Sequence, residues 1–427
     1  MAARRKLRES HRCVALALVL LVGLASRPGA AQTIGRTAFN LRHADFAPES
    51  LARDDFYARL VPLAQAEGSV TLYNFAAGFS AFWKTVAIPR FEQKYGVKVT
   101  YFDVKNDLAD QQLLAAHQAG QDAPTDVFFA GGDTARVLQP AGVIADLPLD
   151  KLLPEAVAYP PDLLRTSFGF DHGGTFMPFH RNQTGIGYNA AFVAANELPT
   201  DFASFLAFAE RHPGKVAITS PLQGGSGEGF LFSLAEDRLT GECRARLDDR
   251  TLSAAAAREW VRASGCLEPV WAYYRRLTKV AEMTNGNADT QNLIANNVAW
   301  LGTVWEDYAV NFVLRRQLPN SFRMTILAGG QTGGGDGLMI PADAPHVAAA
   351  LLFIDFALSR DIQLWKLDHL ASRSARKDIA NYADASPELV PYLIPAERYA
   401  RYAIGYPAPA VMSALKDAFV SAVMTAP

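Results

Sequence analysis

The chain has 427 residues, of which 50% are hydrophobic and 20% are charged. This composition excludes a small disulfide-stapled scaffold and a disordered chain, because it supplies enough apolar material for two or three packed domains. Lysine and arginine number 41 against 43 acidic residues, and no basic block follows the first dozen residues. The electrostatic signature of a nucleic-acid-binding protein is therefore missing, and we expect no nucleic-acid partner.

The N-terminus has the pattern of a secretory signal peptide. Basic residues up to Arg12 precede an uncharged run from Cys13 to Ala25, and small residues follow at Gly29 to Ala31. The run is shorter than the roughly 20 apolar residues that a membrane-spanning helix needs. We expect residues 1–31 to be a signal peptide that is cleaved near Ala31, which predicts a periplasmic protein. The pair at Arg4 leaves both the general secretory and the twin-arginine export routes open.

Two cysteines, Cys243 and Cys266, remain after the expected cleavage. Disulfides persist in exported proteins, so we expect these two residues to pair, with two separate buried thiols as the alternative. Neither cysteine has a convincing histidine partner in the sequence. A nucleophilic role for either is therefore not expected.

The first part of the chain alternates between strand and helix patterns. After a lead-in and an amphipathic helix over 50–66, the expected elements are strand 70–75, helix 80–95, strand 97–102, helix 107–119 and strand 125–130. This βαβαβ order predicts a parallel sheet with helices on both faces.

The pattern changes at residues 175–189, where two short β-like stretches flank a polar centre without a helix. We interpret this segment as a crossover into a second α/β set. The expected elements of that set are helices 201–211, 230–239, 254–265 and 268–277 and strands 215–219, 298–303 and 323–327. The glycine tract 329–335 then precedes a strand-like return crossing at 338–340. A mostly apolar helix over 346–358 follows, and the remainder is expected to be helical.

The sequence does not indicate a metal site. The eight histidines are scattered, with no metal-ligand spacing. Tyr273 and Tyr274 are adjacent, as are the tyrosines of some ferric-ion binders, but they lie in a helical pattern, where one surface and one core tyrosine are the simpler interpretation. We expect no metal, no cofactor and no catalytic residue.

A glycine-rich segment, 224–229, follows an expected strand and precedes an expected helix. Backbone N–H groups in such a place bind anions, although the spacing matches neither a dinucleotide fingerprint nor a phosphate loop. Two interpretations stay open here, a loop that faces a ligand and a merely tight turn.

Aromatic and acidic residues meet at the end of the strand expected over 298–303. Trp305, Asp307 and Tyr308 place flat rings beside carboxylates, which suits an organic cation and serves a sugar equally well. The alternative is a core tryptophan with solvated acids. Phe79 and Asp133 occupy corresponding strand-to-helix turns earlier in the chain, where open α/β sheets place their ligands.

Taken in order, the motifs resemble family 1 extracellular solute-binding proteins of bacterial ABC importers, in the branch that includes binders of polyamines, thiamine and iron. The resemblance covers about residues 66–375. It rests on AEGSVTLYNF, FEQKYGVKVTYF, TDVFFAGGDTARVLQPAGVIADLPLD, TGIGYN, LPTDFASFLA and GGGDGLMIPADAPHVAAALLFIDFALSRDIQ. It implies a two-lobed periplasmic-binding-protein fold of two α/β domains, joined by two crossover hinge segments. Hinge closure on a ligand between the lobes then precedes delivery to a membrane permease.

The resemblance also implies a division of the chain and a site. Residues 32–67 are expected to form an N-terminal segment that leads into the first domain and contains one helix. The protein is expected to be a monomer. Lobe 1 comprises 68–178 plus 335–370, and lobe 2 comprises 182–330 plus 371–427. The ligand-binding residues carried over by position are Asn74, Phe79, Ser80, Gly132, Asp133, Gln223, Ser226, Glu228, Trp305, Asp307, Tyr308 and Asp336.

The ligand expected from these residues is a small organic cation or zwitterion. One departure argues against a polyamine: Gly333–Gly335 precede Asp336, where polyamine binders of the family tend to have an aromatic residue. The alternatives are a sugar, a ferric ion, or an enzyme on the same scaffold that resembles thiaminase and uses a cysteine nucleophile in the cleft. Cys243 and Cys266 fall in the helical part of the second α/β set, in segments away from the cleft, which disfavours the enzyme.

Overall fold

The computed structural model describes residues 40–43 and 46–425. The expected signal peptide and its cleavage site lie outside these residues. Within the described part, no helix combines the length and the apolar character that a membrane crossing needs.

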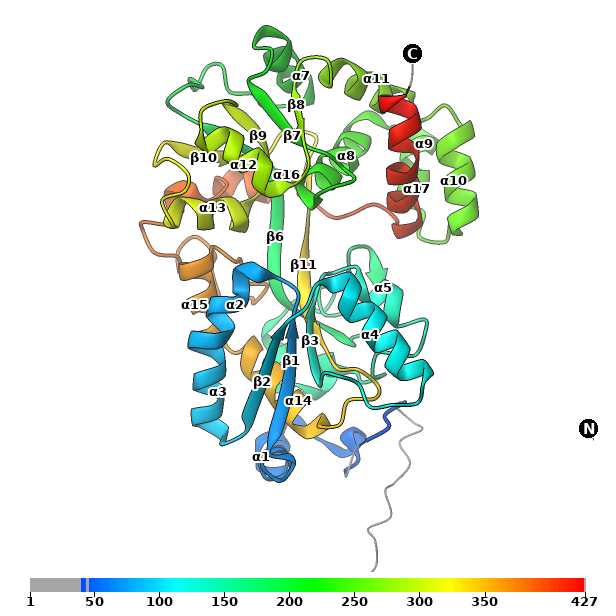
Figure 1. The fold of residues 1–427 in the computed structure, drawn as a ribbon, viewed down its shortest axis with the longest axis vertical. Coiled ribbons are helices and arrows are strands. Elements are labelled where there is room, and N and C mark those ends of the chain that lie inside the picture. Colours follow the sequence, from blue (N-terminus) through cyan, green and yellow to red (C-terminus); the bar gives the residue numbers. More distant parts are fainter. Residues whose placement is uncertain (1–39, 44–45, 426–427) are drawn as a thin grey trace, which may run out of the picture. The chain divides into compact units, whose positions relative to one another are not determined.

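A ten-stranded mixed sheet organises the fold, with its main strands in the order β2-β1-β3-β11-β6-β9-β7-β8 (Figure 1). Strands β1, β2 and β3 are parallel, which confirms the predicted βαβαβ order. These strands, together with the portions of β11 and β6 that pair beside them, are called the first half-sheet below. Its strands are β1 (Ser69–Asn74), β2 (Lys98–Asp103) and β3 (Val127–Ala130).

The helices around the first half-sheet come from both ends of the chain. They are α1 (Phe56–Glu67), α2 (Ser80–Phe82), α3 (Ile88–Tyr95), α4 (Asn106–Gln118), α5 (Thr134–Leu138), α6 (Leu149–Leu152), α14 (Val347–Leu358) and α15 (Arg360–Leu370). A π-helical turn over Trp83–Ala87 joins α2 to α3, so the predicted helix 80–95 is one helical run. A small hairpin, β4 (Thr166–Ser167) and β5 (Phe170–Asp171), follows this region.

The second half-sheet contains the later strands and the second part of β6. Its strands are β7 (Val216–Thr219), β8 (Glu282–Thr284), β9 (Leu301–Trp305) and β10 (Phe322–Thr325). The helices around it are α7 (Phe202–Arg211), α8 (Gly225–Arg238), α9 (Gly241–Leu247), α10 (Ala254–Ala263), α11 (Glu268–Leu277), α12 (Asn287–Ala295), α13 (Glu306–Leu314), α16 (Ala396–Tyr402) and α17 (Pro409–Phe419). A two-residue strand, β12 (Ala403–Ile404), pairs with β11.

Strand β6 (Phe176–Asn189) is shared by the two half-sheets. Its first part pairs with β11 (Gln331–Met339) and its second part with β9 and β10. The prediction of two short stretches is wrong, because the polar centre is bonded inside the sheet. The Gln183 amide donates to the Gln331 carbonyl, and the Thr184 hydroxyl donates to the Thr332 carbonyl. In Figure 1, β6 and β11 run together between the elements around β1–β3 and those around β7–β9.

Two glycine segments that were predicted as loops belong to regular elements. Gly333–Gly335 lie within β11, where a Cβ at Gly335 would stand 2.5 Å from the His180 carbonyl oxygen. Helix α8 begins at Gly225 rather than near residue 230. A Cβ at Gly227 would stand 2.0 Å from the Thr219 carbonyl oxygen. These glycines therefore allow close packing of backbones.

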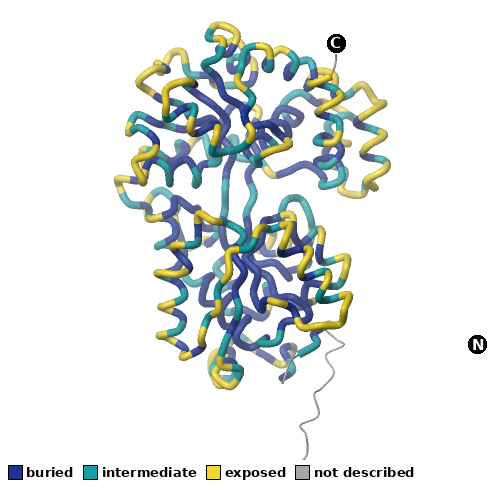
Figure 2. The backbone as a smooth tube through the Cα atoms, viewed as in Figure 1, coloured by how far each residue is buried: buried dark blue, intermediate teal, exposed yellow. Residues whose placement is uncertain are grey.

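The C-terminal region is less helical than predicted. Helix α15 ends at Leu370, and Ala371 takes a left-handed conformation with φ of 52°. Most of residues 371–395 is irregular, and the sequence there contains three prolines, which cannot donate in a helix. By contrast, every residue of α14 is buried, which confirms its predicted core role and is visible in the burial colours of Figure 2.

The predicted disulfide between Cys243 and Cys266 is present, with the two Cα atoms 5.7 Å apart. It links the start of α9 to the segment after α10. We expect thiol titration of denatured residues 32–427 without reductant to find no free thiol. Replacing both cysteines by serine should lower the free energy of unfolding by about 3 kcal/mol, because the cross-link closes a loop in the unfolded chain. Two reactive thiols before reduction would contradict this prediction.

Candidate functional site

A cavity of about 630 Å³ lies where the segments that follow β1, β3 and β9 meet β6 and β11. The predicted site residues that line it are Phe79, Gly132, Asp133, Trp305, Asp307, Tyr308 and Asp336. Six of them lie at or just after strand ends in both half-sheets, which is where open α/β sheets present side chains to a ligand, and Asp336 lies inside β11.

Asn74 and Ser80 do not line this cavity. Both donate hydrogen bonds to Oδ1 of Asp103, at 2.8 and 2.6 Å, and Asn74 also accepts one from the buried indole of Trp83. Ser80 and the Tyr101 hydroxyl contribute to holding the pKa of Asp103 well below its usual range, against the effect of burial. These residues therefore fix the loop between β1 and α2 that carries Phe79.

Gln223, Ser226 and Glu228 also lie outside the lining. Gln223 is exposed, and the buried Ser226 hydroxyl donates to Oδ1 of Asn287 at 2.7 Å. Glu228 accepts a hydrogen bond from the Lys416 ammonium at 2.6 Å. The member of the glycine-rich segment that does line the cavity is Gly225.

Aromatic rings line part of the cavity. Trp305 ends β9 and is half-buried, and a Cβ at Gly225 would stand 2.9 Å from its indole. The first turn of α8 therefore packs directly on the indole and restricts its movement. Phe79 is buried, and its ring centroid lies 5.0 Å from that of the His180 imidazole.

Asp336 is the most buried carboxylate of the lining. The Gly132 N–H donates to its Oδ1 at 3.1 Å, and the Asn182 amide donates to its Oδ2 at 3.3 Å. Burial raises the pKa of Asp336 to about 6, with His180 lowering it and Asp307 raising it further. Asp336 is therefore mostly ionised at neutral pH, but it is close to its titration range.

Asp307 offers an oxygen without a partner. It lies in the first turn of α13, and its Oδ2 is 3.4 Å from Nε2 of His180. Its Oδ1 is buried and has no hydrogen-bond partner among the described residues. A buried carboxylate oxygen with an unused lone pair is costly unless a donor reaches it. A ligand N–H or O–H group is a suitable donor in this position.

Sequence reasoning missed His180 and Asn182, and the start of α12. Residues Asn285 to Asp289 line the cavity, and the short Asn-Gly-Asn-Ala-Asp signal of a turn before a helix could have been recognised. His180 and Asn182 had no such signal, because they lie inside a strand whose polar centre was interpreted as a crossover.

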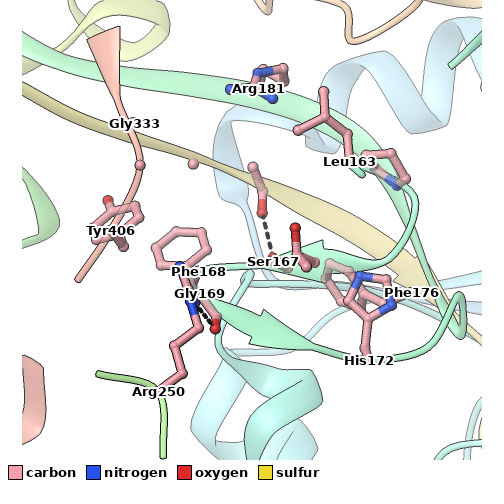
Figure 3. A pocket seen from close by; sticks show the side chains of 15 residues that line it. Leu163, Ser167, Phe168, Gly169, His172, Phe176, Arg181, Arg250, Gly333 and Tyr406 are labelled. Atoms are coloured by element: carbon pink, nitrogen blue, oxygen red, sulfur yellow. Dashed lines mark hydrogen bonds between the residues drawn. The ribbon is translucent and has the colours of Figure 1, made fainter. Parts of the chain in front are cut away.

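Phe168 packs against the glycines of β11. It lies in the turn between β4 and β5, with a positive φ of 44°, and stacks on Tyr406 with centroids 4.4 Å apart. A Cβ at Gly334 would stand 2.7 Å from the Phe168 ring. Figure 3 shows Phe168 beside Tyr406 in a smaller cavity of about 170 Å³. Phe168 lines both cavities, so its ring separates them.

Tyr273 and Tyr274 both lie in the core, away from the cavity, so the prediction of one surface tyrosine is wrong. Both are buried, and the Tyr273 hydroxyl donates to the Phe202 carbonyl at 2.8 Å. The described residues contain no group of three or more histidine, cysteine or acidic side chains that could hold a metal ion.

This protein has a mixed α/β sheet and a polar and aromatic cavity beside its strand ends. These two features are typical of α/β proteins that bind small ligands. The sequence model of the bacterial extracellular solute-binding protein family matches residues 86–390, and the chain belongs to this family. The predicted resemblance is confirmed. Membership also places the chain among extracellular proteins that bind a solute without transforming it.

Several solved structures share the fold. PotD, the substrate-binding protein of a spermidine/putrescine ABC transporter from Streptococcus pneumoniae, aligns with a TM-score of 0.62 and 14% identity over 83% of this chain and 99% of its own. A putative extracellular solute-binding protein from Bordetella parapertussis aligns with a TM-score of 0.61 and 16% identity, over 84% of this chain and 98% of its own. A ferric binding protein from Campylobacter jejuni aligns with a TM-score of 0.55 and 15% identity, over 83% of this chain and 96% of its own. No significant relative was found among curated protein sequences.

Proposed function

We propose that this chain is the periplasmic substrate-binding component of an ABC importer. It captures a small organic cation or zwitterion in the 630 Å³ cavity and delivers the solute to a membrane permease. Family membership supports the solute-binding role, and the fold shared with PotD of Streptococcus pneumoniae supports the transporter.

The negative charge of the cavity lining is the main reason for proposing a cationic ligand. Four carboxylates, those of Asp133, Asp289, Asp307 and Asp336, line the cavity, and no lysine or arginine is among its lining residues. In a partly dehydrated site, unbalanced negative charge attracts an ammonium group and repels an anion. The indole of Trp305 adds a face on which a cation is favoured.

A zwitterion is also compatible with the lining. Helix α12 begins at Asn287, and its first residues face the cavity together with Gly225 at the start of α8. Free N–H groups at helix N-termini bind carboxylates. A ligand with an ammonium group near Asp307 and a carboxylate near α12 would use both features.

A sugar is less well served by the same residues. The side-chain oxygens of Asn182 and Asn287 already accept hydrogen bonds, from the Gly334 N–H and the Ser226 hydroxyl respectively. Fewer neutral acceptors are therefore free for hydroxyl groups. The core position of Tyr273 and Tyr274 similarly removes the phenolates that would favour a ferric ion.

The proposed mechanism of capture is closure of lobe 1 (68–178 plus 335–370) on lobe 2 (182–330 plus 371–427). Two observations support hinges in β6 and β11. The pairing register of these strands shifts between Asp336 and Gly337, and four glycines lie in the central part of β11. Such positions absorb backbone rotation at low cost. The monomer and the permease partner belong to the same proposal.

Small-angle X-ray scattering tests the function together with mass spectrometry. The protein is purified from the periplasm without denaturation, and native mass spectrometry identifies the solute that co-purifies. We expect an ammonium-bearing solute, and a smaller radius of gyration when that solute is added back to the stripped protein. An anionic solute would contradict the ligand class, and an unchanged scattering profile at saturation would contradict hinge closure.

A further inference from the structure

A buried lysine lies behind the carboxylates of the cavity. Lys366 belongs to α15 and is fully buried, and it does not line the cavity. Its ammonium donates to the Ser372 hydroxyl at 2.7 Å and to the Arg373 carbonyl at 3.5 Å, and lies 4.9 Å from the ring centroid of Phe179. No ion pair with a carboxylate holds this ammonium in the described part of the chain. A charge buried in this way is costly to keep.

A line of hydrogen-bonding side chains connects Lys366 to the cavity. The Ser372 oxygen, which accepts from Lys366, lies 2.5 Å from Nδ1 of His180. On the other side of the imidazole, Nε2 lies 3.4 Å from Asp307 and 3.8 Å from Asp336. A hydroxyl group both donates and accepts, and imidazole has two nitrogens. A proton lost at Lys366 can therefore leave toward the cavity through Ser372 and His180.

The other charged groups near Lys366 already have partners. On α13, Glu306 pairs with Arg373, whose carbonyl also faces Lys366. On α14 the titratable residue is Asp355, which accepts from the Tyr57 hydroxyl and from a backbone N–H. The charges of the cavity lining that act on Lys366 are therefore the carboxylates of Asp307 and Asp336, and the His180 imidazole lies next to both.

Lys366 changes its protonation state near neutral pH. Burial lowers the pKa of Lys366 to about 7, although Asp307 and Asp336 raise it. A ligand cation beside these two carboxylates would cancel the support that they give to the Lys366 ammonium. Loss of the proton then becomes favourable in the complex.

We propose that Lys366 is a positioning residue that adjusts its own charge to that of the ligand. When an ammonium group binds between Asp307 and Asp336, Lys366 releases one proton to solvent. One N–H bond of Lys366 breaks: its electron pair stays on the nitrogen, and a water or buffer molecule takes the proton. The total charge beside Asp307 and Asp336 stays constant because one cation replaces another. The inference rests on the proposed cation-binding function. It predicts that affinity for cations rises with pH, since protonated Lys366 competes with the ligand for the same carboxylates.

Isothermal titration calorimetry tests the coupling. The probes are 1,4-diaminobutane, 4-aminobutanoate and the uncharged 1,4-butanediol. They are titrated in two buffers that differ in heat of protonation and contain no primary amine, so that proton release is counted from the difference in heat. At pH 7 we expect the wild-type protein to release about half a proton more than Lys366→Met on binding either amine. Between pH 6 and 8 its affinity should rise about twentyfold. In Lys366→Met the rise should be about twofold, from Asp336 alone.

Two further variants separate the coupling from a structural effect. Lys377→Met, at an exposed lysine of the following segment, should keep the wild-type profile. Ser372→Ala removes an acceptor from the ammonium and should move the midpoint of the profile to lower pH. Amine binding with no proton release and a flat pH profile in the wild-type protein would overturn the coupling and leave the cation function intact. Failure of both amines to bind at every pH, or equal affinity for the diol, would overturn the proposed function and the coupling with it.

Discussion

Replacing Arg373 by methionine should lower the free energy of unfolding by about 3–5 kcal/mol. The Arg373 guanidinium donates to both carboxylate oxygens of Glu306, at 2.5 and 2.7 Å, and both side chains are only 2% exposed. The same guanidinium donates to the Tyr382 hydroxyl at 2.7 Å. Removal of the cation leaves the Glu306 carboxylate buried without its partner, which costs more than the pair itself contributes. Urea unfolding followed by circular dichroism measures the loss.

Two control variants distinguish an unpaired charge from a general packing defect. Arg262→Met breaks an exposed pair with Glu259 and should change stability by less than about 1 kcal/mol. The double variant Arg373→Met with Glu306→Gln removes both buried charges and should recover most of the loss. If the double variant is no more stable than Arg373→Met alone, the loss arises from packing and the electrostatic explanation is wrong.

The pair also explains why Glu306 and Asp307 differ although they are neighbours. Glu306 turns into the protein, where it also accepts from the Ile394 N–H at 2.7 Å. Asp307 turns toward His180 and the cavity. The Arg373 ion pair therefore anchors the first turn of α13 to the segment after α15. The adjacent residues Asp307 and Ser372 are held on either side of His180.

The sequence was informative about the order of elements and about strand ends. Apolar runs predicted β1, β2 and β3 within two residues, because buried strands leave a strong local pattern. The turns after β1, β3 and β9 follow from that order, and they supplied Phe79, Asp133 and Trp305 to the cavity lining. The parallel strands β1 and β3 end at one edge, so local pattern and topology were sufficient for Phe79 and Asp133. Strand β9 is antiparallel to β6 and runs opposite to β1 and β3, and its end meets theirs at the cavity.

The remaining parts of the site depend on contacts between distant segments. His180 and Lys366 are 186 positions apart, and each is unremarkable in its own strand or helix. Phe168 belongs to a hairpin of two-residue strands, too short to give a periodic pattern. The glycines of β11 looked like a loop, because the ring that fills the space above them comes from that hairpin. Such pairings are set by tertiary packing, which a single sequence does not display.

Replacing Trp305 by alanine should weaken binding of the co-purified solute by about thirtyfold. A cation over a tryptophan face in a dehydrated cavity contributes about 2 kcal/mol, and each 1.4 kcal/mol is tenfold in affinity. The indole is well placed to act as such a face, because Gly225 packs against it and limits its rotation. Calorimetry at fixed pH measures the change. Trp305→Phe should retain part of the affinity, and Trp300→Ala, in a stack with Phe192 away from the cavity, should retain all of it.

The charge of the solute is tested in the same series by Asp307→Asn, which keeps the shape of the side chain. For a cation we expect a loss comparable to that of Trp305→Ala, because a charge-assisted hydrogen bond contributes about 1.5–3 kcal/mol. For an uncharged sugar the loss should be smaller, since the amide oxygen still accepts from a hydroxyl group. Losses in both variants identify a stacked cation, whereas a loss in Trp305→Ala alone identifies a stacked neutral ligand. Wild-type affinity in both variants would move the binding site away from the segment that joins β9 to α13.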